Sequence, residues 1–233
     1  ILLQAPTIEQ LALHLTQLRQ DEATPWPTLV PIQATGDLPP FFCVPGSGGN
    51  VLYLHALARC LGPQQPFYGL QAVGLDGVTP PFVTMEAIAA HNIAAIKQIQ
   101  PHGPYRLGGH SFGGKVAFAM AQQLLQAGEE VTHLLLFDAA APIPTPKAAA
   151  SGQDDVWWLV GLAAAFGELL GQQTQLSAVE VRELDSDEQL HAFQHELERL
   201  NLLPAGSDLR QARGLVQLFK SNQRMHYAPS TVL

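Results

Sequence analysis

The stretch with the clearest chemical meaning is a serine that lies between glycines. Gly109, Ser111 and Gly113 form the pattern Gly-x-Ser-x-Gly. In a nucleophile elbow, this pattern displays a serine hydroxyl on a sharp turn between a strand and a helix. The flanking glycines allow the strand and the helix to pack closely. The sequence therefore predicts a serine nucleophile for acyl transfer, and the alternatives are a phosphate-binding loop or a glycine-rich turn with an incidental serine.

An acidic residue follows the next apolar run along the chain. Residues 131–137 are almost entirely apolar and end at Asp138. Such a run is typical of a parallel strand that is covered on both faces. A right-handed crossover places this strand beside the one before Ser111, so that both residues lie at the carboxyl edge of the sheet. We predict that Asp138 orients the catalytic base, and the alternative is a turn or capping residue.

A glycine-rich loop at residues 45–50 lies between a predicted strand and a predicted helix. It lacks the Gly-Lys-Ser/Thr ending of a phosphate loop. Acyl transfer needs backbone N–H donors that face the developing oxyanion. We predict that the N–H groups of Ser47 and Phe112 supply this oxyanion hole.

The general base is the part that the sequence does not supply. In this type of site the histidine follows the serine and the acid in chain order. His226 does so, but it lies at a predicted helix end, and His110 is interpreted as a packed structural residue. His191 and His195 are four residues apart, without a third metal ligand nearby, so no metal site is predicted. We expect the base to lie beyond Leu233, and we therefore expect the 233-residue chain to turn over weakly or not at all on its own.

The surrounding elements alternate between strands and helices up to Asp138. Apolar patterning predicts strands at residues 29–33, 41–44, 67–71, 105–107 and 131–137, and helices at 51–61, 84–100 and 115–126. Only helices are predicted afterwards: 156–170, one that begins at a Ser186 and Gln189 capping box, and one from Ser207 to Tyr227. The fold class is therefore α/β, with a mostly parallel sheet flanked by helices and an all-helical insertion. The insertion is either a lid over an acyl-binding channel or a subdomain that packs on the core.

The predicted domain organisation has five parts. Residues 1–20 form an amphipathic helix, 21–28 a proline-containing linker, 29–145 the α/β core, 146–228 the helical lid and 229–233 the start of a further core segment. A single short helix does not bury its apolar stripe alone. We therefore expect residues 1–20 to be the last helix of a preceding domain.

Composition excludes several classes of function. The net charge of −8, without a basic cluster, argues against a nucleic-acid partner, and no apolar run is long enough to span a membrane. Two cysteines without metal-ligand spacing favour a reducing, cytoplasmic compartment.

Together these segments resemble a known family. Residues 29–233 resemble the terminal thioesterase domains of nonribosomal peptide and polyketide synthases, in the α/β-hydrolase superfamily. The segments that carry the resemblance are FFCVPGSGGN at 41–50, FYGLQAVG at 67–74, YRLGGHSFGG at 105–114, LFD at 136–138 and the lid helices. Residues 1–20 look like the last helix of an acyl or peptidyl carrier domain.

The resemblance implies a role for each site residue. Ser111 would accept the acyl chain, Asp138 would be the triad acid, and Phe112 and Ser47 would donate to the oxyanion, although this chain has Pro45-Gly46 where many relatives have His-Pro. The family's histidine and its phosphopantetheine serine have no counterpart in the chain.

The resemblance also implies the reaction. An acyl or peptidyl chain would move from the phosphopantetheine thioester of an upstream carrier domain in cis to the serine, and would leave by hydrolysis or macrocyclisation. No cofactor would be bound directly. The alternatives are a free-standing editing thioesterase, a carboxylesterase, or a non-catalytic carrier-docking module that lacks the base.

Overall fold

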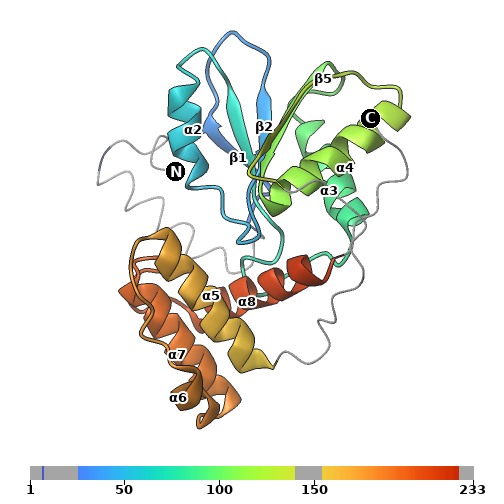
Figure 1. Cartoon of the computed structure of the whole chain (residues 1–233). Coiled ribbons are helices and arrows are strands. Elements are labelled where there is room, and N and C mark those ends of the chain that lie inside the picture. Colours follow the sequence, from blue (N-terminus) through green and yellow to red (C-terminus); the bar gives the residue numbers. More distant parts are fainter. Residues whose placement is uncertain (1–6, 8–25, 140–153, 226–233) are drawn as a thin grey trace.

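The structure of this protein is a computed structural model that describes Thr7 and residues 26–139 and 154–225 (Figure 1). In this part of the chain, five strands form one sheet in the order β1-β3-β2-β4-β5. The strands are β1 (Leu29–Gln33), β2 (Phe41–Val44), β3 (Phe67–Leu70), β4 (Tyr105–His110) and β5 (Val131–Phe137). Only β1 runs antiparallel to its neighbour, β3, and the other neighbouring strands are parallel. The predicted mostly parallel sheet is confirmed.

Helices cover both faces of this sheet. Helix α2 (Leu54–Cys60) lies on one face, and α3 (Met85–Ile96) and α4 (Phe112–Gln126) pack together on the other (Figure 1). The side chains of β2 alternate between two cores, as they do in any strand. Phe41 and Cys43 join the core beneath α2, whereas Phe42 and Val44 join the core beneath α3 and α4. All four side chains of β2 are therefore buried, and the strand is fixed on both faces directly before the glycine-rich loop.

Strand β5 differs from its prediction. It lies at the edge of the described sheet and pairs only with β4 there. Leu134 packs on the α3–α4 side and Phe137 on the α2 side, but Leu135 and Leu136 are 43% and 44% exposed. The prediction of a strand covered on both faces is therefore wrong for the described residues. Apolar content predicted the strand correctly, but it carries no information on where the strand lies in the sheet.

The residues after β5 form a helical unit with a core of its own. Its helices are α5 (Asp155–Leu169), α6 (Ala178–Arg182), α7 (Ser186–Arg199) and α8 (Leu209–Arg224). Phe193 and Leu197 of α7 are fully buried among apolar residues of α5 and α8. The five-residue helix α6 was not predicted because a helix of one turn leaves no apolar period to detect.

Two helix starts in this unit are shifted from their predicted positions. The capping box of α7 uses Asp185 and Glu188 rather than Ser186 and Gln189. The Asp185 carboxylate accepts from the backbone N–H groups of Asp187 and Glu188, and the Glu188 side chain accepts from the Asp185 N–H. Helix α8 begins at Leu209, after an Asp208 cap, rather than at Ser207. In both cases an aspartate lies next to the predicted serine and caps the helix instead.

Several predictions fall on residues outside the described ranges. They concern the helix at 1–20 apart from Thr7, most of the linker, the boundary near 145–146 and the segment 229–233. Among the helices that the structure describes, none is both long and apolar enough to cross a membrane.

Candidate active site

Ser111 lies on the turn between β4 and α4. Strand β4 ends at His110, α4 begins at Phe112, and Ser111 between them has φ 55° and ψ −119°. A positive φ is strained for a residue with a side chain, and such strain is stored mainly at functional sites. The strand–serine–helix arrangement that the sequence predicted is confirmed, although its catalytic role stays a prediction.

The glycines around Ser111 lie where no side chain fits. A Cβ on Gly109 would collide with the carbonyl oxygen of Gly113, and one on Gly113 would collide with the carbonyl oxygens of Val44 and Pro45. These contacts involve backbone atoms, which do not move aside easily. The predicted close approach of strand and helix is confirmed, and it also fixes the end of β2 against the first turn of α4.

Ser111 and Asp138 follow the aligned ends of neighbouring parallel strands. His110 is in register with Phe137, and the Ser111 N–H donates to the Phe137 carbonyl oxygen over 2.8 Å. Asp138 comes next, with an exposed side chain and a φ of 46°. The structure thus brings the two residues to the same edge of the sheet, as the crossover predicted, and leaves the Asp138 carboxylate accessible to a partner.

Three of the hydrogen bonds that hold the glycine-rich loop, residues 45–50, lie close to Ser47. The Gly46 N–H donates to the Tyr53 hydroxyl (2.9 Å), the Gly49 N–H donates to the Gly46 carbonyl (2.8 Å), and the Asn222 Nδ2 donates to the Ser47 carbonyl (2.9 Å). Among the described residues, no group accepts from the Ser47 N–H. We call this loop the oxyanion loop, because Ser47 was predicted to supply a donor from it.

The second predicted donor belongs to the first turn of α4. Phe112 is the first residue of that helix, so its N–H has no earlier helical carbonyl to bond. The positive end of the helix dipole also lies there. The N–H groups of Ser47 and Phe112 are therefore both available to a developing negative charge.

Tyr53 joins the oxyanion loop to the residue before the candidate nucleophile. Its hydroxyl lies 3.0 Å from His110 Nδ1, and the two rings meet edge to face with centroids 5.6 Å apart. Partial burial raises the pKa of Tyr53 above its ordinary value. His110 thus packs against Tyr53, and its interpretation as a structural residue stays a prediction. Sequence reasoning missed the role of Tyr53, which no local motif marks.

Several described histidines have polar partners other than Ser111 and Asp138. His91 pairs with the Thr28 hydroxyl at 2.7 Å, His102 lies near Glu129 and His195 near Glu198. Burial also lowers the pKa of His91. None of the histidines in residues 26–139 and 154–225 hydrogen-bonds to Ser111 or Asp138, and His226 lies outside these ranges. No cluster of three metal-binding side chains is present among the described residues, where His191 and His195 lie on α7.

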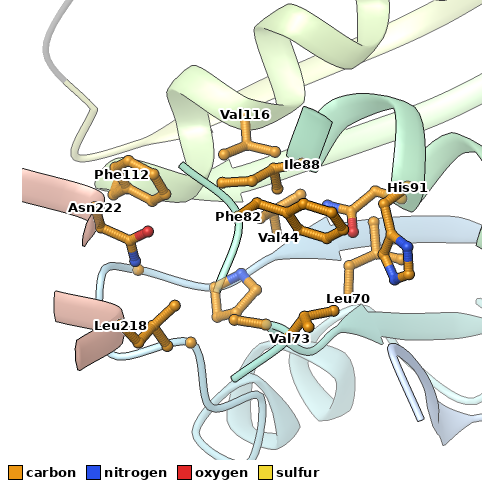
Figure 2. Close-up of a pocket in the computed structure, with 15 residues that line it drawn as sticks. Val44, Leu70, Val73, Phe82, Ile88, His91, Phe112, Val116, Leu218 and Asn222 are labelled. Carbon is orange, nitrogen blue, oxygen red and sulfur yellow. The ribbon is translucent and has the colours of Figure 1, made fainter. Parts of the chain in front are cut away.

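A small apolar pocket of about 30 Å³ adjoins the oxyanion loop (Figure 2). Besides Gly46 and Gly49 of the loop, apolar side chains from several elements line it: Val44, Leu70, Phe82, Ile88, Phe112 and Leu218. Leu218 and Asn222 come from α8, so the helical unit contributes directly to the wall of this pocket. Figure 2 shows both side chains on the same side of the pocket as Phe112.

Comparison with known proteins agrees with this fold. Residues 39–212 match the family model described as thioesterase domain. The chain is 45% identical over 142 residues to an indigoidine synthase of Dickeya dadantii (strain 3937). The aligned residues make up 61% of this chain but only 9% of that synthase. The chain therefore spans a small part of the curated relatives it matches.

Solved structures show the same fold. A four-domain nonribosomal peptide synthetase bound to AMP and glycine aligns with 98% of this chain and 17% of its own, at 27% identity and a TM-score of 0.82. A thioesterase domain in covalent complex with a fluorophosphonate nocardicin G analogue aligns with 78% of this chain and 71% of its own, at 26% identity and a TM-score of 0.52.

Proposed function

Since the chain belongs to the thioesterase domain family, we propose that it releases an acyl or peptidyl chain from a carrier-bound thioester through Ser111. The Ser111 Oγ attacks the thioester carbonyl while a base removes its proton. The carbon–sulfur bond then breaks, and the departing thiolate takes up the proton. Water or a nucleophile within the bound chain attacks the resulting ester, which regenerates Ser111 and gives a hydrolysed or cyclic product.

One observation carries this proposal, namely the elbow conformation of Ser111 at the carboxyl edge of the sheet. Its φ of 55° and the hydrogen bond from its N–H to Phe137 fix the backbone beside Asp138. The N–H groups of Ser47 and Phe112 would donate to the negatively charged oxygen of the tetrahedral intermediate. Stabilisation of this charge is usually the largest single contribution to catalysis of acyl transfer. Asp138 would orient the base.

We propose that the base lies outside the described residues. None of the described histidines hydrogen-bonds to Ser111 or Asp138, so His226 or a histidine further along the polypeptide would serve. A carboxylate that is exposed, as Asp138 is, remains open to such a partner.

A carrier domain in cis is the proposed source of the substrate. The relatives named above include synthetases in which a domain like this one is a small part of a long chain. The acyl group would arrive on a phosphopantetheine arm, and residues 1–20 would be the last helix of the carrier. The phosphopantetheine would be attached to the carrier, so residues 26–233 would bind no cofactor directly.

Replacement of Ser111 tests the proposal. In the complete polypeptide that contains this chain, Ser111→Ala should abolish the acyl-ester adduct that mass spectrometry detects after loading of the carrier. Cys60 is an exposed free thiol that thioesters acylate without an enzyme, so Cys60→Ser removes that background and serves as the matched control. An adduct of unchanged mass and amount in Ser111→Ala would overturn the assignment. Tight binding of a loaded carrier without any adduct in the wild type would favour the docking module.

A further inference from the structure

Helix α8 contacts the core along its length, first through its N-terminal half at residues 74–77 and then through a face near its C-terminal end. Leu218 packs against Gly49, the Ser221 hydroxyl donates to the Phe82 carbonyl over 2.8 Å, and Asn222 Nδ2 donates to the Ser47 carbonyl over 2.9 Å. Residues three and four apart lie on the same face of a helix. This face of α8 therefore reaches the oxyanion loop directly, at two of its residues.

Asn222 is the buried polar member of this contact. Its side chain is 5% exposed, and its Oδ1 has no hydrogen-bond partner in the described structure. The orientation of the amide is set by chemistry, because the reverse orientation would place the side-chain oxygen against the Ser47 carbonyl oxygen, and both are acceptors. A leucine would fill the same space without burying an unpaired acceptor. Packing alone therefore does not account for an asparagine here, whereas the bond to Ser47 does.

The bond from Asn222 restrains the peptide group next to the one that carries the Ser47 N–H. The Gly46 carbonyl and the Ser47 N–H belong to a single planar peptide group. Gly49 holds that plane through the Gly46 carbonyl, Tyr53 holds the preceding peptide group through the Gly46 N–H, and Asn222 holds the following one through the Ser47 carbonyl. Two of these three restraints come from side chains outside the loop, one on each side of the Ser47 N–H.

We propose that Asn222 is a positioning residue through which α8 fixes the Ser47 N–H for stabilisation of the oxyanion. This inference rests on the proposed thioesterase function. It makes α8 a structural part of the catalytic site. A movement of α8 away from the core would withdraw Asn222 and loosen the donor.

Steady-state kinetics of the complete polypeptide test this role, with the octanoyl thioester of N-acetylcysteamine as the probe. Asn222→Leu should lower kcat about 10- to 100-fold with KM within about twofold, because the restraint acts on a donor that is used in the transition state. The matched control is Ser221→Ala, which removes the neighbouring polar contact of α8 with the core. It should leave kcat within about twofold of the wild type. Equal losses of kcat in the two variants would mean that Asn222 only helps α8 to dock, and would overturn the proposal.

A second variant keeps the proposal testable if the leucine variant does not fold. Asn222→Asp has the same shape but places a carboxylate oxygen against the Ser47 carbonyl, so kcat should fall at least as far as in Asn222→Leu. Wild-type kcat in Asn222→Asp would refute the role of Asn222 while leaving the thioesterase function intact. Thioester turnover that is unchanged in Ser111→Ala would refute the proposed function itself.

Discussion

Glu196 fastens the loop between α5 and α6 to helix α7, and its replacement is the perturbation whose effect the structure defines best. The carboxylate accepts from the Thr174 hydroxyl and the Gln175 N–H, both at 2.8 Å, and from Arg199 Nε and Nη2, both at 2.9 Å. Glu196 is 5% exposed. The hydrogen bonds from Arg199, together with those from Gln175 and Thr174, outweigh burial and lower the pKa of Glu196 from 4.5 to about 2.

The magnitude follows from linkage between protonation and folding. A pKa held near 2 rather than 4.5 corresponds to about 3 kcal/mol of stability at neutral pH, at about 1.4 kcal/mol for each pH unit. Arg199 is 31% exposed, so solvent screening reduces this to about 2 kcal/mol. Because the folded-state pKa is the lower one, the contribution is complete above the unfolded pKa of 4.5 and is lost as the pH falls toward 2. About 0.8 kcal/mol of it should be gone at pH 4.

Urea unfolding of Glu196→Gln at pH 7 and pH 4 measures this contribution. The variant should be less stable than the wild type by about 2 kcal/mol at pH 7, and the difference should shrink by about 0.8 kcal/mol at pH 4, because the wild type alone loses the carboxylate. Glu183→Gln, an exposed position in the same helical unit, is the matched control and should change stability by less than about 0.5 kcal/mol. If the stability difference between the wild type and Glu196→Gln is the same at pH 7 and pH 4, the ionised carboxylate of Glu196 is not what stabilises this loop.

Two further predictions concern the other parts of the site and its sheet. Tyr53→Phe removes the acceptor of the Gly46 N–H, so kcat for thioester release should fall about 3- to 10-fold with KM unchanged, since one hydrogen bond contributes about 0.5–1.5 kcal/mol. A wild-type kcat in this variant would show that Tyr53 does not support the oxyanion loop. In thiol labelling followed by peptide mapping, Cys60 should react rapidly at pH 8 and Cys43 only on unfolding, because burial raises the pKa of Cys43 to about 12. Labelling of the two cysteines at comparable rates in the folded chain would contradict the burial of β2.

The elbow was predictable because its signals are local. Glycines on both sides of Ser111, a short strand before it and a helix pattern after it specify one turn, and the crossover rule then places Asp138 beside it. The edge position of β5 was not predictable in the same way. An apolar run indicates a strand, but the exposure of Leu135 and Leu136 depends on what covers each face of the sheet.

The supports of the oxyanion loop were missed because they are not local. Asn222 lies 175 residues from Ser47 in the chain, and nothing in the sequence around either residue marks the pair. The capping box of α7 was displaced by one residue for the opposite reason, since two adjacent residues, Asp185 and Ser186, both suit a cap. Only the contacts of the folded chain distinguish between them.

The composition of the oxyanion loop explains why it needs support from outside. Gly46, Gly48 and Gly49 let the chain turn tightly between β2 and α2, and Gly49 has a φ of 70°. Glycine also loses more conformational freedom on folding than any other residue, so such a loop has little rigidity of its own. A donor that stabilises an oxyanion works only if it is already in place when the charge develops. Its order must then come from neighbouring side chains, and the described structure supplies them from Tyr53, the N-cap residue of α2, and from Asn222 of α8. The helical unit is therefore expected to influence the rate of the chemical step even where it does not touch the substrate.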